Sequence, residues 1–351
     1  MSGPNVLLTG ASGSLGSNVL EKLIEANYTV DAVLRSLTRS KPFLAHKYAA
    51  AVASGQLTFT EIADMTAPGA FDAGLSNASY LLHVATPLGF DNFEETVFQP
   101  AEKLMSNILQ SAKRSTTLKR VVITGSIVST MRLPNDMMSN RVISSADYND
   151  IPLAEATTDV GAAYQYSKVT AEKQAWAFMK REKPQWDLVF HLTPSITGRS
   201  IQQGWRSEKT GLGGMSSIYR SLFDREAVTM MVPHFLDVDD VAFMHVKSLD
   251  TAAVPGNKRY LASAGIIDSN DVARKIREEF PQLRNRVPEP AAGTGIPDAL
   301  VTLDLAETDE VFGTAWKGGW ETARATVLDI LTTEKKYGVA QDKVEDILNS
   351  A

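Results

Sequence analysis

A tyrosine, a lysine and a serine are the residues of this chain whose types and spacing could carry acid catalysis. Tyr164 and Lys168 stand four positions apart in a segment of helical character, so they share one helix face, whereas Tyr166 points elsewhere. A nearby ammonium favours the ionised form of a phenol, whose ordinary pKa is about 10. Tyr164 could therefore act as an acid near neutral pH.

The third member of this set is Ser126, which follows the β-branched run at residues 120–124. Enzymes built on parallel sheets bind ligands outside the carboxyl ends of their strands. A hydroxyl at that point can donate to a carbonyl oxygen that gains negative charge. Ser129 is the competing hydroxyl, and it lies beyond the expected strand tip.

A glycine-rich segment at residues 9–16, with the sequence TGASGSLG, predicts a dinucleotide site. It stands between an apolar strand and an amphipathic helix, where the helix dipole and unpaired N–H groups can meet a pyrophosphate. Gly10 and Gly13 would allow a tight turn and a close approach, and Gly16 close packing of helix and strand. The expected cofactor contacts are Gly10, Ser12, Gly13, Ser14, Leu15 and Gly16.

The end of the second predicted strand indicates which dinucleotide would bind, because an acid there pairs with a ribose hydroxyl and an arginine accepts a 2′-phosphate. Arg35 stands at that point, and Arg39 and Lys41 follow. Asp31 is the rival, but it lies early in the strand. We therefore expect NADP(H) rather than NAD(H).

Short apolar runs alternate with helical patterns through the first half of the chain, as in an α/β fold of the Rossmann type, with a doubly wound parallel sheet. The expected strands are Asn5–Thr9, Tyr28–Leu34, Leu57–Ile62, Ser79–Val84, Arg120–Thr124 and Trp186–Leu192. The expected helices between them are Leu15–Ala26, Glu95–Ser115 and Gly161–Arg181.

After Pro194 the alternation breaks, which indicates a smaller mixed lobe. We expect a nucleotide-binding domain over residues 1–193, to which about 236–262 return, and a substrate lobe over 194–235 and 263–351. Other features are a Gly-rich segment at 198–214, an apolar run at 227–232, a helix at 237–250, a strand at 258–261, a surface connection at 284–297, and helices at 319–333 and 340–348.

Composition excludes several classes of protein. The 351 residues carry a formal charge of −6 without a basic patch, which disfavours a nucleic-acid partner. The chain has no cysteine, and its five histidines lack ligand spacing, so no metal site is expected. No apolar run approaches the roughly 18 residues that span a bilayer, and no signal peptide is readable, so we expect a cytoplasmic protein.

Taken together, these motifs resemble the extended short-chain dehydrogenase/reductase family, in its branch of dihydroflavonol reductases and fungal or yeast NADPH-dependent aldehyde, ketone and methylglyoxal reductases. The resemblance covers nearly the whole chain. Besides the residues above, it rests on Asp64, the segment His83–Pro87, Asn107 and the segment Thr193–Ser195.

The resemblance implies further site residues. Asp64 would bind the adenine amine and Met65 would line its pocket. The remaining implied cofactor contacts, beside Tyr164 and Lys168, are Ala85, Thr86, Pro87, Thr124, Pro194, Ser195 and Ile196. The expected substrate neighbours are Thr86, Ile127, Val128, Trp205 and Met215.

The chain departs from the family pattern in two places. Gly125 replaces a serine common before the catalytic one, and residues 103–105 lack the usual small side chains. His83, inside an apolar strand, is interpreted as a packed core residue.

The resulting hypothesis is an NADPH-dependent oxidoreductase that delivers hydride to a small or medium lipophilic aldehyde or ketone, as a monomer or homodimer. Tyr164 would donate the proton, Ser126 would polarise the oxygen, and Lys168 would assist the tyrosine and hold the ribose. One alternative is a nucleotide-sugar epimerase or dehydratase, although dehydratases of the family carry an acidic pair where this chain has Ile127 and Val128. A non-catalytic NADP-sensing regulator is the other.

Overall fold

Seven strands form one parallel sheet, and the apolar runs of its central strands are buried on both faces. The computed structural model describes residues 3–86, 92–204, 214–223, 232–293, 295–338 and 344–350. The strand order is β10-β7-β5-β4-β1-β2-β3, and all neighbours are parallel. The strands are β1 (Asn5–Thr9), β2 (Thr29–Leu34), β3 (Leu57–Glu61), β4 (Tyr80–His83), β5 (Arg120–Thr124), β7 (Asp187–Leu192) and β10 (Lys258–Leu261).

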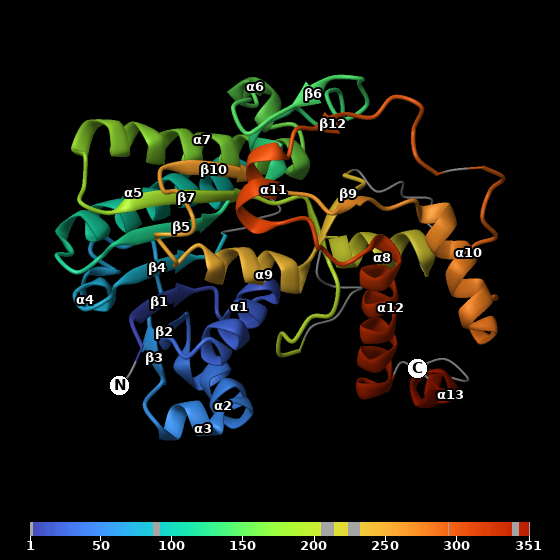
Figure 1. Ribbon diagram of the computed structural model, residues 1–351, viewed down its shortest axis with the longest axis horizontal. Helices are drawn as coiled ribbons and strands as arrows, with labels where there is room; N and C mark the ends of the chain where they lie inside the picture. Colours follow the sequence, from blue (N-terminus) through green and yellow to red (C-terminus); the bar gives the residue numbers. More distant parts are fainter. Residues whose placement is uncertain are drawn as a thin grey trace.

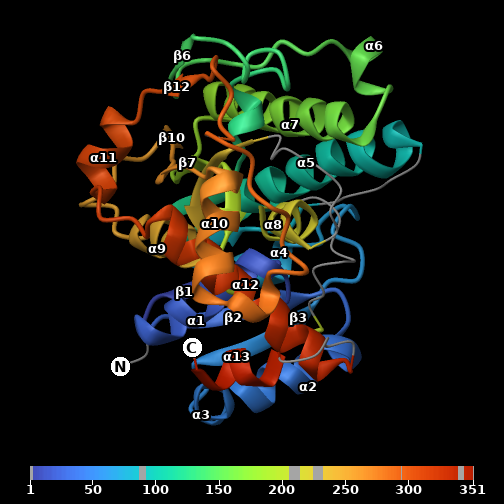
Figure 2. The same cartoon turned by 90° about the vertical axis from the view of Figure 1, so that its right-hand side faces the viewer.

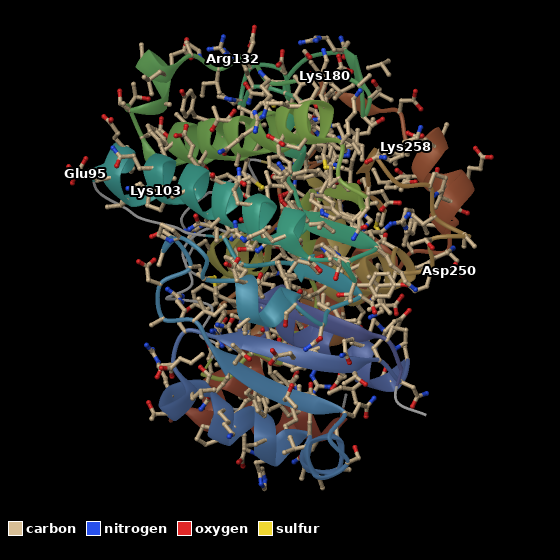
Figure 3. All side chains as sticks on the ribbon, turned by 90° about the vertical axis from the view of Figure 1, so that its left-hand side faces the viewer. Glu95, Lys103, Arg132, Lys180, Asp250 and Lys258 are labelled. Carbon is tan, nitrogen blue, oxygen red and sulfur yellow. The ribbon has the colours of Figure 1, made fainter. Side chains whose placement is uncertain are left out.

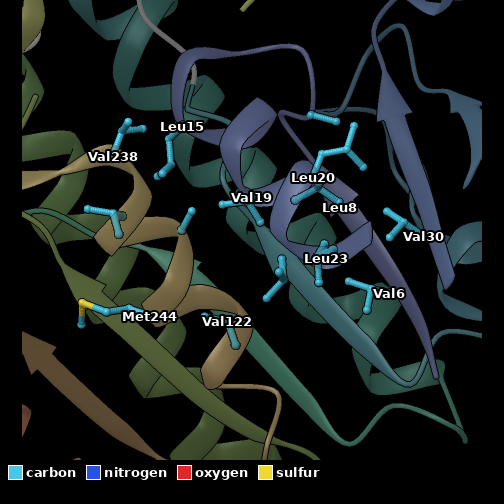
Figure 4. Packing of buried hydrophobic residues seen from close by; sticks show 14 of the residues in the cluster. Val6, Leu8, Leu15, Val19, Leu20, Leu23, Val30, Val122, Val238 and Met244 are labelled. Atoms are coloured by element: carbon cyan, nitrogen blue, oxygen red, sulfur yellow. The ribbon is translucent and has the colours of Figure 1, made fainter. Parts of the chain in front are cut away.

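Two pairs of helices cover this sheet (Figure 1). The helices α1 (Ser14–Glu25) and α9 (Val238–Lys247) pack on one face. Figure 4 shows Leu15, Val19, Leu20 and Leu23 of α1 beside strand residues such as Leu8. On the other face, α5 (Gln99–Arg114) and α7 (Val160–Glu182) share a second apolar core with the alternate strand residues. Charged side chains such as Lys180 project outward, as Figure 3 shows.

The order in which successive strands are added to the sheet reverses at β1. Strands β2 and β3 follow on one side of β1, and β4 and the later strands lie on the other. In open α/β sheets, the crevice at such a switch point receives ligands at the carboxyl ends of the strands. The glycine segment follows β1 at this crevice, and Ser126 follows β5 two strands away. The topology therefore places both predicted motifs along one edge of the sheet.

A smaller lobe is built on a second sheet, in the order β11-β9-β8. Its helices share a separate apolar core, and they lie together at the right of Figure 1 and the front of Figure 2. The elements of this lobe are β8 (Ser195–Thr197), α8 (Gly214–Leu222), β9 (His234–Asp237), β11 (Gly265–Ile266), α10 (Ser269–Glu279), α12 (Gly319–Lys336) and α13 (Val344–Ser350).

The buried carboxylate of Asp237 joins the two lobes. Asp237 caps α9 by accepting the N–H of Asp239 at 2.9 Å, and it accepts the Thr322 hydroxyl of α12 at 2.7 Å. Lys317 donates to Asp237 at 3.1 Å and to Asp239 at 2.7 Å. A carboxylate with no exposed surface needs such partners, so this cluster fixes α12 against the end of β9.

The remaining elements are short or flank the sheet. They are α2 (Leu37–Lys47), α3 (Ala49–Ala53), α4 (Asp72–Leu75), the π-helical turn η1 (Glu94–Phe98), the 3₁₀ turns η2 (Ile127–Ser129) and η3 (Pro281–Leu283), β6 (Val142–Ile143), α6 (Leu153–Ala156), β12 (Thr302–Leu303) and α11 (Ala306–Phe312).

The structure confirms the predicted fold class, and each end of the six predicted strands from Asn5 to Leu192 agrees within one residue. The chain also returns to the main sheet at β10. The helix predicted at 237–250 starts one residue later, because Asp237 ends β9 and serves as the cap. The sequence did not predict the three-stranded sheet of the smaller lobe or the helix α10. Much of 198–214 and 227–232, and the start of 340–348, lies outside the described residues. The division into two domains stays a prediction.

In the part of the chain that the structure describes, no helix has the length and apolarity needed to cross a bilayer.

Candidate active site

The ammonium of Lys168 lies where the carboxyl ends of β4 and β5 meet. Its Nζ donates to the hydroxyl of Thr86 at 3.0 Å and to the main-chain carbonyl of Thr124 at 3.3 Å. The helix that carries Lys168 begins at a defined point, because the Asp159 carboxylate accepts the N–H groups of Gly161 and Ala162. The lysine is therefore placed by two strand ends and a capped helix.

Tyr164 lies one turn before Lys168 on the same helix. The lysine Nζ is 5.6 Å from the centroid of the Tyr164 ring, and the ring packs partly buried against the core. Tyr166 faces another way and packs on Phe98, with 4.9 Å between ring centroids. The four-residue spacing thus places the lysine ammonium beside the tyrosine ring, on the helix face that the sequence predicts.

Ser126 lies at the start of η2, directly beyond β5. Its Oγ accepts the N–H of Val128 at 3.4 Å, so its own hydrogen remains available to another acceptor. Ser129, the competing hydroxyl, is 1% exposed, and its Oγ is buried without a hydrogen-bond partner. Ser126 is itself only 6% exposed, so the choice of Ser126 over Ser129 stays a prediction.

A cavity opens between these strand ends and the helices α5 and α7. Thr86, Thr124 and Lys168 contribute polar groups to its wall. Leu104 and Met105, which lie in the segment that departs from the family pattern, line it as well.

Sequence reasoning missed His245, which is buried on the opposite face of the sheet. Its Nδ1 lies 2.8 Å from the Val241 carbonyl and must carry the hydrogen, so Nε2 accepts the Thr124 hydroxyl at 2.7 Å. Burial lowers the pKa of His245 to about 4, although the Val241 carbonyl opposes the shift. A neutral histidine therefore holds the residue whose carbonyl binds Lys168.

His83 is buried, as predicted, and it also lines the cavity. Thr9 Oγ1 accepts the N–H groups of Val84 and Ala85, so its hydrogen goes to His83 Nδ1 at 2.7 Å. Burial and the nearby Lys168 charge lower the pKa of His83 to about 3. These bonds tie the end of β1 to the end of β4.

The glycine segment has the geometry of a close-packed turn. Gly10 has a φ of +78°, and a Cβ there would lie 2.9 Å from the Ala85 nitrogen. A Cβ on Gly16 would lie 1.9 Å from the Gly10 carbonyl oxygen. The helix that follows has neither a side-chain cap nor an acid in its first turn. Its N–H groups can therefore face an anion.

Arg35 directly follows β2, and Arg39 and Lys41 follow on α2; all three cations are exposed. The rival Asp31 is engaged on the neighbouring strand, where its carboxylate accepts the Thr60 hydroxyl at 2.7 Å. This engagement supports the choice of Arg35. Glu61, which the sequence reasoning did not single out, accepts the N–H of Leu37 at 2.6 Å and so caps α2.

Asp64 and Met65 lie in the loop after β3. Asp64 is exposed, and hydrogen bonds from the Thr66 hydroxyl and N–H hold the pKa of its carboxyl below the usual value. The Asn107 amide of α5 donates to the carbonyls of Met65 and Ala67 at 3.3 and 3.0 Å. Asn107 therefore fixes the loop that carries both predicted adenine contacts.

Other predicted contacts are spread between the lobes. Pro194 is buried, while Ser195 and Ile196 are partly exposed on β8. Ile127 and Val128, at 1% and 4% exposure, pack into the core, so their contact with substrate stays a prediction.

Met215 is 5% exposed, and its sulfur lies 3.7 Å from the Ser14 hydroxyl, beside the glycine segment. Pro87 and Trp205 lie outside the described residues.

The glycine at position 125 is explained by packing. A Cβ there would lie 3.0 Å from a methyl group of Leu192 and 3.1 Å from the His191 carbonyl oxygen. The serine usual in the family would therefore crowd β7 in this chain.

The NAD dependent epimerase/dehydratase family model matches residues 6–262. The chain belongs to this family. Ketoreductase CTB6 of Cercospora beticola is 31% identical over 339 residues, covering 88% of this chain and 89% of that protein. Aldehyde reductase 2 of Sporidiobolus salmonicolor is 28% identical over 343 residues, covering 95% and 96%. The crystal structure of Gre2 from Candida albicans with NADPH shares the fold, with a TM-score of 0.84, 24% identity and 94% and 99% of the two chains covered.

The buried histidines predict a loss of stability in acid. Between pH 6.5 and 4 the unfolded state binds a proton at residue 245 that the folded state does not. The free energy of unfolding therefore decreases as the pH is lowered through this range. The lowered pKa of His245 corresponds to a loss of about 3 kcal/mol. We expect His245→Gln to be less stable than the parent at neutral pH and to lose less stability on acidification. Urea unfolding at several pH values measures both effects, and parallel pH dependences for the two proteins would contradict the assignment.

Proposed function

We propose that this protein is an NADPH-dependent carbonyl reductase, which reduces small or medium lipophilic aldehydes or ketones to alcohols. The observation that carries the proposal is the position of Lys168, hydrogen-bonded to the ends of β4 and β5 with Tyr164 one turn away. Relatives named ketoreductase and aldehyde reductase align over most of the chain, which supports the same reaction class.

The residues present fit a dinucleotide. The positive φ of Gly10 and the contact distances at Gly16 leave no room for side chains, so the backbone alone would face the pyrophosphate. Arg35 would bind the 2′-phosphate, and Lys168 the nicotinamide ribose. When bound, NADPH would supply the hydride that reduces the carbonyl carbon.

The chain's own groups would supply the proton and stabilise the developing charge. Ser126 accepts from Val128 and so has its hydrogen free to donate to the carbonyl oxygen. Tyr164 would transfer its phenolic proton to that oxygen, and the Lys168 ammonium would stabilise the phenolate that remains. Thr86 and the Thr124 carbonyl hold the ammonium in place for this step.

The site disfavours the two rival functions. A dehydratase of this family would need carboxylates after Ser126, where the chain has the buried Ile127 and Val128. MoeE5, which was crystallised with the nucleotide sugar UDP-glucose and NAD, shares the fold with a TM-score of 0.63, compared with 0.84 for Gre2. A sensor that only binds NADP would not require the pair of Tyr164 and Lys168, which the chain retains. Cytoplasmic location and the oligomeric state stay predictions.

Removal of the phenolic hydroxyl tests the proposed acid. Tyr164→Phe should bind NADPH as the parent does, yet lower kcat at least about 100-fold, the usual contribution of a general acid. NADPH fluorescence titration and the rate of NADPH oxidation with phenylglyoxal measure the two effects. Tyr166→Phe, the same change two residues away, is the matched control and should keep its rate. Near-parental turnover in Tyr164→Phe would contradict the assignment of Tyr164 as the general acid.

Charge removal at the end of β2 tests the cofactor preference. Arg35→Ala should raise the KM for NADPH about tenfold or more and leave the KM for NADH nearly unchanged, because only NADPH carries the phosphate that Arg35 would bind. Arg181→Ala, an exposed arginine at the far end of α7, is the control. Equal effects on both cofactors would contradict a phosphate contact.

A further inference from the structure

Two buried amide side chains join the segment that carries Ser126 to the helix that carries Tyr164. They are Asn149, 1% exposed, from the loop before α6, and Gln165, 4% exposed, which directly follows Tyr164. Neither was singled out by sequence reasoning. Buried amides in contact with backbone groups fix the geometry of those groups, because an unmade hydrogen bond there is costly.

Asn149 fixes the turn that follows Ser126. Its Nδ2 donates to the carbonyls of Val128 and Met131, both at 2.8 Å, and its main-chain N–H donates to the Ser129 carbonyl at 2.8 Å. Its Oδ1 accepts the N–H of Ile151 at 2.8 Å. The side chain is thus satisfied at both ends, and it holds the carbonyl of Val128, the residue whose N–H donates to Ser126 from the preceding peptide.

Gln165 connects this turn to α7. Its Oε1 accepts the N–H of Leu133 at 2.7 Å, while its Nε2 donates to the Leu133 carbonyl at 3.3 Å. The Asn149 amide nitrogen lies 3.2 Å from the same Oε1 and shares with it one of the two hydrogens that it donates to the carbonyls of Val128 and Met131. The helix itself packs on η2. A shift of the turn relative to the helix would therefore break several buried hydrogen bonds at once.

We propose that Asn149 and Gln165 form a positioning pair that sets the Ser126 hydroxyl in register with the Tyr164 phenol. The proposal rests on the proposed function, in which both hydroxyls act on one carbonyl oxygen. The direction of the Ser126 hydrogen depends on the Val128 N–H, and Asn149 anchors the Val128 carbonyl. Because catalysis is sensitive to displacements of about 1 Å, loss of the pair should lower turnover without loss of the fold.

A double-mutant cycle between Gln165→Met and Ser126→Ala tests the pair, with phenylglyoxal and NADPH as substrates. Gln165→Met should lower kcat roughly 10- to 100-fold and leave the KM for NADPH unchanged. In the Ser126→Ala protein, which is itself expected to lose roughly 100-fold or more, the same change should cost less than about twofold, because the positioned hydroxyl is already gone. Equal losses in both backgrounds would indicate a general structural role and overturn the proposal.

Gln174→Met is the matched control, because Gln174 stands on the same helix and its Oε1 has no hydrogen-bond partner. It should leave kcat unchanged relative to the parent and relative to the Ser126→Ala protein, respectively. If Gln165→Met does not fold, as judged by circular dichroism, Asn149→Asp takes its place in the cycle, since aspartate keeps the Oδ1 acceptor and loses the amide donor. Unchanged turnover in Ser126→Ala would instead overturn the proposed role of Ser126, so the two failures are distinguishable.

Discussion

The placement of one ammonium group connects the sheet to the chemistry of this protein. Lys168 reaches from α7 to the hydroxyl after β4 and the carbonyl at the end of β5. Lys168 is partly exposed, and the two acceptors hold its ammonium at this edge of the sheet. The lysine therefore ties α7 to the two strand ends, and the tyrosine one turn earlier lies in the same place.

A second layer of neutral, buried groups supports that arrangement. His245 holds Thr124 from the opposite face of the sheet, and Thr9 and His83 tie β1 to β4. On the other side, Asn149 and Gln165 bind the turn after Ser126 to α7. None of these groups carries charge in the folded state near neutral pH, so they fix positions without competing with the lysine for the developing negative charge.

The sequence was sufficient for the parts of the structure that depend on local periodicity. Buried parallel strands are continuous apolar runs, and four-residue spacing on a helix placed Tyr164 beside Lys168. It failed where function depends on contacts between distant segments. Gln165 and His245 carry no local signal, since their partners at Leu133 and Thr124 lie 32 and 121 positions away. The strands of the small sheet are two to four residues long, too short to show an alternating pattern.

Transfer of an isotope tests the central claim most directly. The protein is incubated with NADPH deuterated at either C4 position, together with phenylglyoxal and with a panel of aliphatic and aryl aldehydes and ketones. The account predicts an alcohol with deuterium on the former carbonyl carbon, formed from one of the two labelled cofactors in step with NADPH oxidation. Tight binding of NADPH without its consumption by any carbonyl compound would contradict it.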